Sequence, residues 1–191
     1  MWVLLAFPWH LLHAQSMNDS VFSTAELASI PLFDAAAGHV VSVPGGRALK
    51  LFVFLSPECP LCQNYSLTLN RLHRQYAGRV NFFGIVPGKT WKATDITAFE
   101  TKYHVSYPVW LDRSFEFTHS LHASATPEVI LLTPAGVLIY KGAIDNWFKA
   151  LGRSRGRPTE NYLQDAIDRA LRQEPVPVKR TVPVGCLIND F

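Results

Sequence analysis

The sequence predicts an α/β protein with a central mixed sheet, helices on both faces, and a C-terminal β-hairpin followed by a helix. Short apolar runs typical of strands alternate with segments whose apolar residues recur at helical spacing. Such alternation is typical of largely parallel sheets covered by helices. Two later apolar runs instead flank a turn with Pro and Gly, which predicts an antiparallel hairpin at the sheet edge.

Length and composition favour one folded domain. The chain has 191 residues, of which 48% are apolar, enough for a substantial core. Its net charge is only +3 and it has no basic stripe interleaved with aromatics, so we expect no nucleic-acid partner. Three cysteines are too few for a disulfide scaffold. We expect the domain to span residues 17–175, between an N-terminal segment, 1–16, and a tail, 176–191, with a lone cysteine.

The N-terminal segment 1–16 resembles a secretory signal peptide. It is apolar, it is shorter than the roughly 20 residues of a membrane-spanning helix, and small Ala14 stands at the expected cleavage position. The usual Lys or Arg near the start is absent, which leaves a misplaced start or a buried strand as alternatives. We expect a periplasmic or secreted protein, or a cytoplasmic one if the segment is not a signal. No later segment has transmembrane length, so we expect no integral membrane segment.

The first half of the domain shows four elements. Residues 33–43 alternate in polarity and end at Pro and Gly residues, which predicts a hairpin. Residues 49–55 form a continuous apolar run, typical of a central strand buried on both faces. A helix that stops at Gly78 follows, and residues 80–86 form a second buried strand. The apolar face of that helix comprises Leu61, Tyr65, Leu69, Leu72 and Tyr76.

The second half continues the alternation. Three helices are predicted, the first capped by Thr94, the second by Asp112 or Ser114, and the last by Thr159. Residues 107–111 form a short strand between the first two. The predicted hairpin comprises residues 129–132 and 137–140, and the last helix ends before Pro175 and Pro177.

A Cys-x-x-Cys motif lies where the first central strand gives way to a helix. Cys59 stands at the start of that helix, where unpaired N–H groups and the helix dipole favour the thiolate. Cys62 lies about one helical turn further on and can form a disulfide with Cys59. The motif therefore predicts a redox pair, with Cys59 as the nucleophile and Cys62 as the resolving thiol.

Other uses of a Cys-x-x-Cys motif fit this chain less well. A structural disulfide remains an alternative. A structural zinc site needs four ligands, but no second Cys or Cys–His pair stands at ligand spacing. Gln63 follows Cys62 where a c-type haem site has His. We therefore expect no metal site and no cofactor.

Several segments together resemble the thioredoxin superfamily, in particular the redoxin branch that includes alkyl hydroperoxide reductase and thiol-specific antioxidant proteins. They are Ser-Pro-Glu-Cys-Pro-Leu-Cys at 56–62, Ala-Thr-Pro-Glu at 125–128, and the hairpin at 129–142. The resemblance covers roughly residues 33–171. The closing Pro-Val-Gly-Cys-Leu-Ile at 183–188 is similar to a tail found in some secreted redoxin-like proteins.

The resemblance implies a thioredoxin-like fold and a thiol–disulfide oxidoreductase. It implies that Pro127 is cis, packs against the two cysteines, and lets Thr126 present backbone groups to an extended substrate. A disulfide-containing protein or small thiol would be the substrate, and a membrane or periplasmic donor would supply electrons.

Two departures from related families bear on the chemistry. Thioredoxins carry a buried Asp six residues before the first Cys, where this chain has Val53. Proton transfer from Cys62 would then use water, Glu58 or Glu128. Peroxiredoxins carry a Thr that Ser56 can replace, but also a Pro, at whose position this chain has Phe52. Peroxide reduction by Cys59 is therefore the runner-up activity.

Two further interpretations stay open. Cys59 and Cys62 are soft ligands suited to Cu(I), so a metallochaperone is an alternative, although such proteins usually space the two thiols by three residues. Cys186 is either a third redox thiol or a small buried apolar residue among Val184, Leu187 and Ile188.

Overall fold

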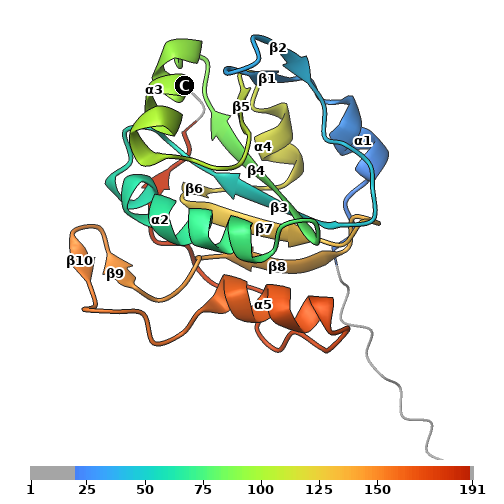
Figure 1. Cartoon of the computed structure of the whole chain (residues 1–191), viewed down its shortest axis with the longest axis vertical. Helices are drawn as coiled ribbons and strands as arrows, with labels where there is room; N and C mark the ends of the chain where they lie inside the picture. Colours follow the sequence, from blue (N-terminus) through green and yellow to red (C-terminus); the bar gives the residue numbers. More distant parts are fainter. Residues whose placement is uncertain (1–19, 190–191) are drawn as a thin grey trace, which may run out of the picture.

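Strand β3 (Leu49–Phe54) is an interior strand of a seven-stranded mixed sheet in a computed structural model that describes residues 20–189 (Figure 1). The strand order is β2-β1-β5-β4-β3-β7-β8. Strands β3, β4 and β5 run parallel, and the remaining neighbours are antiparallel. This arrangement confirms the predicted mixed sheet. The predicted signal segment, 1–16, lies outside the described residues.

The strands follow the predicted runs closely. The other strands of the large sheet are β1 (Leu32–Asp34), β2 (His39–Val41), β4 (Val80–Pro87), β5 (Val109–Asp112), β7 (Glu128–Leu132) and β8 (Leu138–Gly142). Two small sheets, which the sequence did not predict, pair β9 (Phe148–Ala150) with β10 (Arg153–Ser154) and β6 (Ala125–Thr126) with β11 (Cys186–Leu187).

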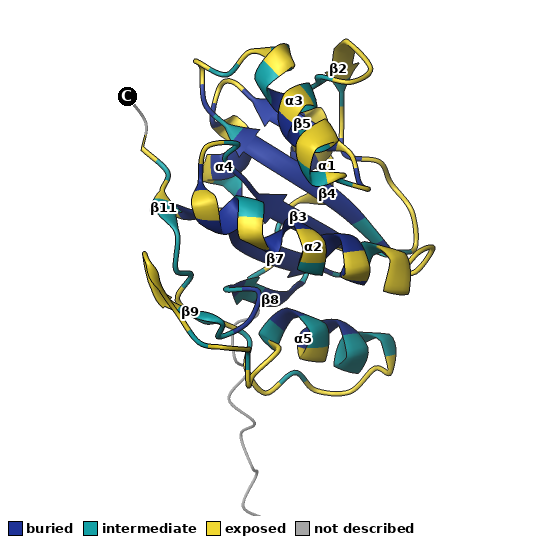
Figure 2. Ribbon diagram, turned by 60° about the vertical axis from the view of Figure 1, so that its left-hand side comes forward, coloured by how far each residue is buried: buried dark blue, intermediate teal, exposed yellow. Residues whose placement is uncertain are grey.

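The sheet is covered on both faces (Figure 2). Helices α2 (Pro60–Gln75), α3 (Ala93–Tyr103) and α5 (Tyr162–Leu171) pack against one face. Helices α1 (Thr24–Ser29) and α4 (Glu116–Ser120) pack against the other. Among residues 20–189, no helix is long and apolar enough to cross a membrane.

Strand β3 is buried on both faces because its side chains alternate between the two cores. Leu51 and Val53 join the core under α2, whereas Phe52 packs its ring against Phe83 and Phe117 on the opposite face. This confirms the prediction of a central strand. It also places Phe52 on the face away from the Cys-x-x-Cys helix.

Three predicted helix caps were wrong by a few residues. Helix α3 has Lys92 at its N-cap instead of Thr94, because Asp95 accepts a hydrogen bond from the Lys92 backbone N–H. Helix α5 begins after Asn161, and Thr159 instead accepts a hydrogen bond from the Asn146 side chain. The start of α3 is thus marked by a contact between residues three positions apart, whereas contacts with the more distant Asn146 keep Thr159 in the loop before α5.

Helix α4 has its own capping arrangement. Its N-cap residue is Phe115, with positive φ, and not Asp112 or Ser114. Nevertheless, the Asp112 carboxylate accepts hydrogen bonds from the N–H and hydroxyl of Thr118, at 2.7 and 2.6 Å. Asp112 therefore satisfies a free N–H of the first turn from a position outside the helix.

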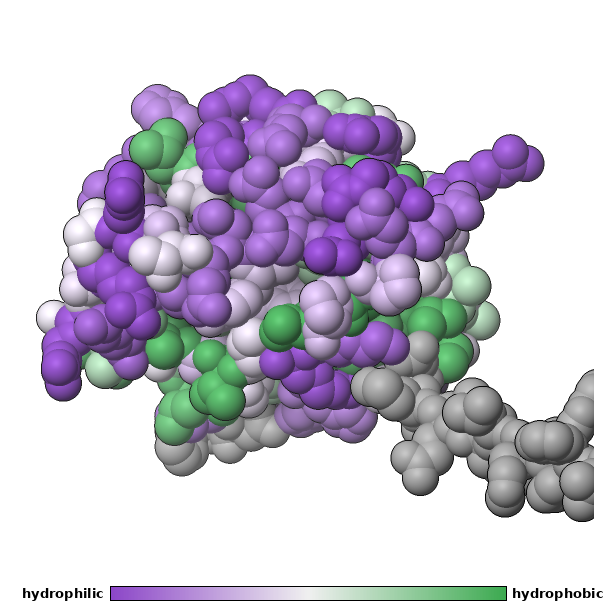
Figure 3. All heavy atoms as spheres, turned by 90° about the horizontal axis from the view of Figure 1, so that it is seen from below, coloured by the Kyte–Doolittle hydropathy of each residue, from purple (hydrophilic) through white to green (hydrophobic). Residues whose placement is uncertain are grey.

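Helix α5 is amphipathic. Leu163, Ala166 and Ile167 are buried against the sheet. Viewed from below Figure 1, the surface on this side is largely hydrophilic, with apolar residues in small separate areas (Figure 3).

Candidate active site

Cys59 is the N-cap residue of α2. Strand β3 ends at Phe54, a short loop reverses the chain, and Pro60 occupies the first turn of the helix, where its missing N–H costs nothing. The Cys59 N–H donates to Ser56 O at 3.1 Å, and its carbonyl accepts from Gln63 N at 3.1 Å. The fold thus places Cys59 among the unpaired N–H groups of a helix start, as predicted.

The surroundings of Cys59 favour its thiolate. Hydrogen bonding from the Cys62 thiol lowers its pKa most, burial opposes this, and hydrogen bonds from the Cys186 thiol and the N–H groups of Cys62 and Leu61 lower it further, to about 4 from an ordinary 9.0. The side chain is only 2% exposed. Cys59 is therefore a stabilised thiolate at neutral pH, and its side chain is almost entirely buried.

Cys62 has the opposite character. It is wholly buried, and burial, reinforced by its hydrogen bond with Cys59 and the charge there, holds its pKa well above 9.0. The Ser56 N–H lies 3.5 Å from its sulfur. In the reduced protein, Cys59 is thus the thiolate and Cys62 is the neutral thiol, and neither sulfur forms a disulfide.

The Thr126–Pro127 peptide bond is cis, as the family resemblance implied. The Thr126 carbonyl oxygen lies 3.2 Å from the Cys59 sulfur and accepts its hydrogen bond when Cys59 is protonated. Thr126 belongs to β6, which pairs with β11, and its backbone lies directly beside the Cys59 sulfur. The structure therefore brings Cys59 and Thr126 together across 67 positions of sequence.

A third sulfur joins this pair. The Cys186 thiol lies 2.9 Å from the Cys59 sulfur and donates a hydrogen bond to it. Burial, then its hydrogen bond with Cys59, raises the pKa of Cys186 to about 11. Cys186 is half-buried, packs against the core and contacts Cys59, so both predicted interpretations, a redox thiol and a small apolar residue, stay open at this point.

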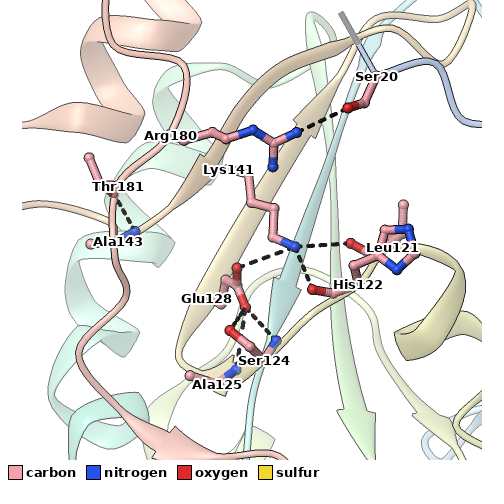
Figure 4. Close-up of polar contacts among 10 residues, drawn as sticks. All are labelled: Ser20, Leu121, His122, Ser124, Ala125, Glu128, Lys141, Ala143, Arg180 and Thr181. Carbon is pink, nitrogen blue, oxygen red and sulfur yellow. Dashed lines mark hydrogen bonds and ion pairs between the residues drawn. The ribbon is translucent and has the colours of Figure 1, made fainter.

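Glu128 lies apart from the sulfurs. It shares the face of β7 with Ile130, whereas Val129 faces the core that contains the cysteines. Its carboxylate accepts from Ser124 N at 2.7 Å and pairs with Lys141 at 3.7 Å (Figure 4). Within the part of the chain described, it makes no hydrogen bond with a sulfur, so its predicted role as proton acceptor finds no contact to support it.

The loop before Cys59 carries the other two predicted auxiliary residues. Ser56 is half-buried, and its backbone, rather than its hydroxyl, contacts Cys59 and Cys62. Glu58 is exposed beside the motif. Their predicted roles stay predictions.

Two cavities flank the site. One of about 300 Å³ is lined by Ser56, Lys89, Thr126 and Cys186 among other residues. Another of about 180 Å³ lies beside Pro127, and its wall includes Tyr65, whose hydroxyl donates to buried Asp145 at 2.5 Å. No group of three or more His, Cys, Asp or Glu side chains that could hold a metal ion occurs among residues 20–189.

The sequence did not single out two residues that shape this site. Lys141 donates hydrogen bonds to the carbonyls of Leu121 and His122 in the loop before Thr126. Nothing in the sequence around Lys141 indicates these contacts. Gly185 lies so close to Thr126 that an added Cβ would be 2.2 Å from the Thr126 oxygen. Its position immediately before Cys186 was the available signal.

Comparisons with known proteins agree with this geometry. No curated protein matches the chain in sequence. An uncharacterized conserved protein from Geobacillus kaustophilus has a similar structure, with TM-score 0.77 and 20% identity over 90% of this chain and 93% of its own. A hypothetical protein from Sinorhizobium meliloti gives 0.76 and 21% over 88% and 93%.

A secreted disulfide oxidoreductase from Mycobacterium tuberculosis is more distant, with TM-score 0.52 and 16% identity over 60% of this chain and 82% of its own. These likenesses confirm the thioredoxin-like fold. The Redoxin family model matches residues 30–147, which include both cysteines of the motif and the cis proline. The chain therefore belongs to the redoxin family, within the thioredoxin superfamily.

Proposed function

We propose that this protein is a thiol–disulfide oxidoreductase that uses Cys59 and Cys62 as its redox couple. The observation that carries the proposal is the opposite protonation of two neighbouring thiols. The pKa of Cys59 is lowered to about 4, while that of Cys62 is held well above 9.0. Such a pair holds one thiolate ready to attack and keeps the second thiol in reserve.

The reaction proceeds in two exchanges. The Cys59 thiolate attacks one sulfur of a substrate disulfide, a bond forms between the two sulfurs, and the other substrate sulfur leaves as a thiolate. Cys62 then loses its proton to solvent and attacks the Cys59 sulfur, which releases the second substrate thiol. The substrate gains two electrons and the protein ends with a Cys59–Cys62 disulfide. An external dithiol restores the reduced protein.

The backbone of Thr126 supplies the substrate contact. Strand β6 carries main-chain groups beside the Cys59 sulfur, where β11 of the chain's own tail pairs, and a substrate strand that replaces the tail would make main-chain hydrogen bonds at the same place. An extended peptide that carries a disulfide is therefore the substrate class that fits best, and a periplasmic or membrane dithiol is the expected electron donor.

The test is turnover of a disulfide-linked peptide with dithiothreitol as donor. Cys59→Ser should reduce the rate to that of dithiothreitol alone, since the attacking sulfur is gone. Cys62→Ser should still react once at Cys59. Full turnover by Cys59→Ser would overturn the proposal. So would a wild-type protein that consumes hydrogen peroxide far faster than disulfide, which would assign it to peroxide reduction.

We further propose export from the cytoplasm, on the basis of the signal-like segment 1–16. Expression of residues 1–191 in a bacterial host should yield a periplasmic protein whose amino terminus lies just after Ala14. An intact Met1 in the cytoplasmic fraction would contradict this.

A further inference from the structure

The C-terminal tail lies on the edge where an external substrate would pair. Strand β11, the red arrow near β6 in Figure 1, runs antiparallel to β6. Cys186 lies opposite Thr126 and Leu187 opposite Ala125. The Ile188 N–H continues the pairing with a hydrogen bond to Ser124 O at 3.0 Å. The chain's own tail thus makes the main-chain contacts that the proposed function assigns to a bound peptide.

The tail is also anchored by contacts that lie far from the sulfurs. Thr181 N donates to Lys141 O at 3.0 Å, and Lys141 N donates to Lys179 O at 2.9 Å. The Thr181 hydroxyl oxygen also accepts from Ala143 N at 2.9 Å (Figure 4). These contacts anchor the tail along β8, so that residues 182–188 reach the site as a tethered strand.

Apolar burial explains only part of the position of the tail. Val184, Cys186 and Ile188 pack against the two cores, but Leu187 is 75% exposed and Val182 is 86% exposed. A segment held by the hydrophobic effect alone would bury all of these side chains. In addition, the tail backbone pairs with Thr126, and Gly185 allows a very close approach to it.

We propose that Cys186 is a third redox thiol and that the tail acts as an internal substrate, so that Cys59 passes its disulfide from Cys62 to Cys186. The proposal rests on the proposed function, because the first disulfide is formed there. It is carried by the 2.9 Å contact between the Cys186 and Cys59 sulfurs on a strand that pairs like a substrate.

The exchange is balanced. The Cys186 sulfur loses its proton and attacks the Cys59 sulfur of the Cys59–Cys62 disulfide, a Cys59–Cys186 bond forms, and Cys62 leaves and takes up a proton. No further oxidant is needed, since the substrate disulfide has already removed two electrons. The product keeps the tail on the β6 edge, so an external dithiol has to reduce this disulfide before another peptide binds.

The experiment uses the full chain with Cys62→Ser and glutathione disulfide as the only oxidant. Cys59 should first acquire glutathione, and Cys186 should then displace it to form a Cys59–Cys186 disulfide. Acid quenching, alkylation and peptide mass spectrometry identify the products over time. A stable Cys59–glutathione adduct with Cys186 still open to alkylation would overturn the proposal.

Two glycine variants distinguish docking of the tail on β6 from the mere presence of the Cys186 thiol. In the Cys62→Ser background, Gly185→Ala pushes a methyl group against the Thr126 oxygen, and it should slow formation of the Cys59–Cys186 bond by about a hundredfold. Gly156→Ala, where a Cβ meets nothing within 4 Å, should leave the rate unchanged. Equal rates in the two variants would contradict a docked internal substrate.

A further variant distinguishes the two proposals. Cys62→Ser with Cys186→Ser should retain glutathione on Cys59. If this variant takes up glutathione while Cys62→Ser alone forms no Cys59–Cys186 bond, the role of Cys186 is overturned and Cys59 exchange still holds. If it takes up none, the proposed function fails, and the tail proposal fails with it.

Discussion

Lys141 and Glu128 form an ion pair of 3.7 Å directly behind the loop that leads to Thr126 (Figure 4). The Lys141 ammonium also donates to the carbonyls of Leu121 and His122, while Glu128 accepts from Ser124 N. Burial lowers the pKa of Lys141, and the nearby Glu128 opposes this. The pair thus joins β7 and β8 to the loop before the cis proline.

Loss of the Lys141 charge should destabilise the fold. Lys141→Met leaves the Glu128 carboxylate buried without its cation, and we expect the free energy of unfolding to fall by about 2–3 kcal/mol, because the Lys141 side chain is only 14% exposed. Urea denaturation measures the change. The exposed Lys149→Met should change it by less than about 0.5 kcal/mol.

A double variant checks that the cause is the unpaired charge. Adding Glu128→Gln to Lys141→Met should recover part of the lost stability, since a neutral amide oxygen still accepts from Ser124 N. No recovery would contradict this account.

The pKa of Cys59 should depend on both neighbouring thiols, Cys62 and Cys186. In the reduced protein, the ultraviolet absorbance of one thiolate should appear with a midpoint at about pH 4. Cys62→Ala should move the midpoint upward more than Cys186→Ala does, because hydrogen bonding from Cys62 is the larger cause. The reverse order, or a wild-type midpoint near 9.0, would contradict the assigned geometry.

The same shift predicts how stability depends on pH. Because the folded pKa of Cys59 lies below its ordinary value, the stabilisation by its thiolate is fully present above pH 9.0 and is lost as the pH falls to about 4. Cys62, whose pKa is raised, has the opposite dependence and stabilises the fold below pH 9.0. The difference in unfolding free energy between the wild type and Cys59→Ala should therefore shrink as the pH is lowered toward 4.

Asp112 and Ser114 offer a matched test of the α4 cap. Asp112→Ala removes the acceptor for the Thr118 N–H and should cost about 1–2 kcal/mol of unfolding free energy. Ser114→Ala removes only a 3.4 Å contact with Glu116 N at the surface and should cost less than about 0.5 kcal/mol. Asp112→Asn, which keeps an acceptor oxygen, should lie near the wild type. Equal losses at the two positions would contradict a capping role for Asp112.

Most of the sheet could be predicted from local patterns. The run at 49–55 became β3, and the apolar spacing of residues 61–76 matches the buried face of α2. The Cys-x-x-Cys position was also predictable, because a strand, a turn and a helix start follow one another within about a dozen residues. Helix α1 was not predicted, since its six residues bury only Leu27.

The contacts around the sulfurs could not be predicted from local sequence patterns. Glu128 stands next to the predicted Thr-Pro pair, yet strand alternation turns its carboxylate toward Lys141. Helix α3 begins at Lys92 through the nearby Asp95, whereas Thr159 stays in the loop before α5 because it contacts Asn146, 13 positions away.

Local residue order by itself determined the class of fold and the place of Cys59 at a helix start, because hydrophobic periodicity and the free N–H groups of a helix start act over one or two turns of chain. Only the tertiary structure decided that Cys186, 127 positions away, meets Cys59, and that the tail takes the Thr126 edge. That outcome depends on strand pairing between distant segments and on the close approach at Gly185, and neither leaves a periodic signal in the sequence.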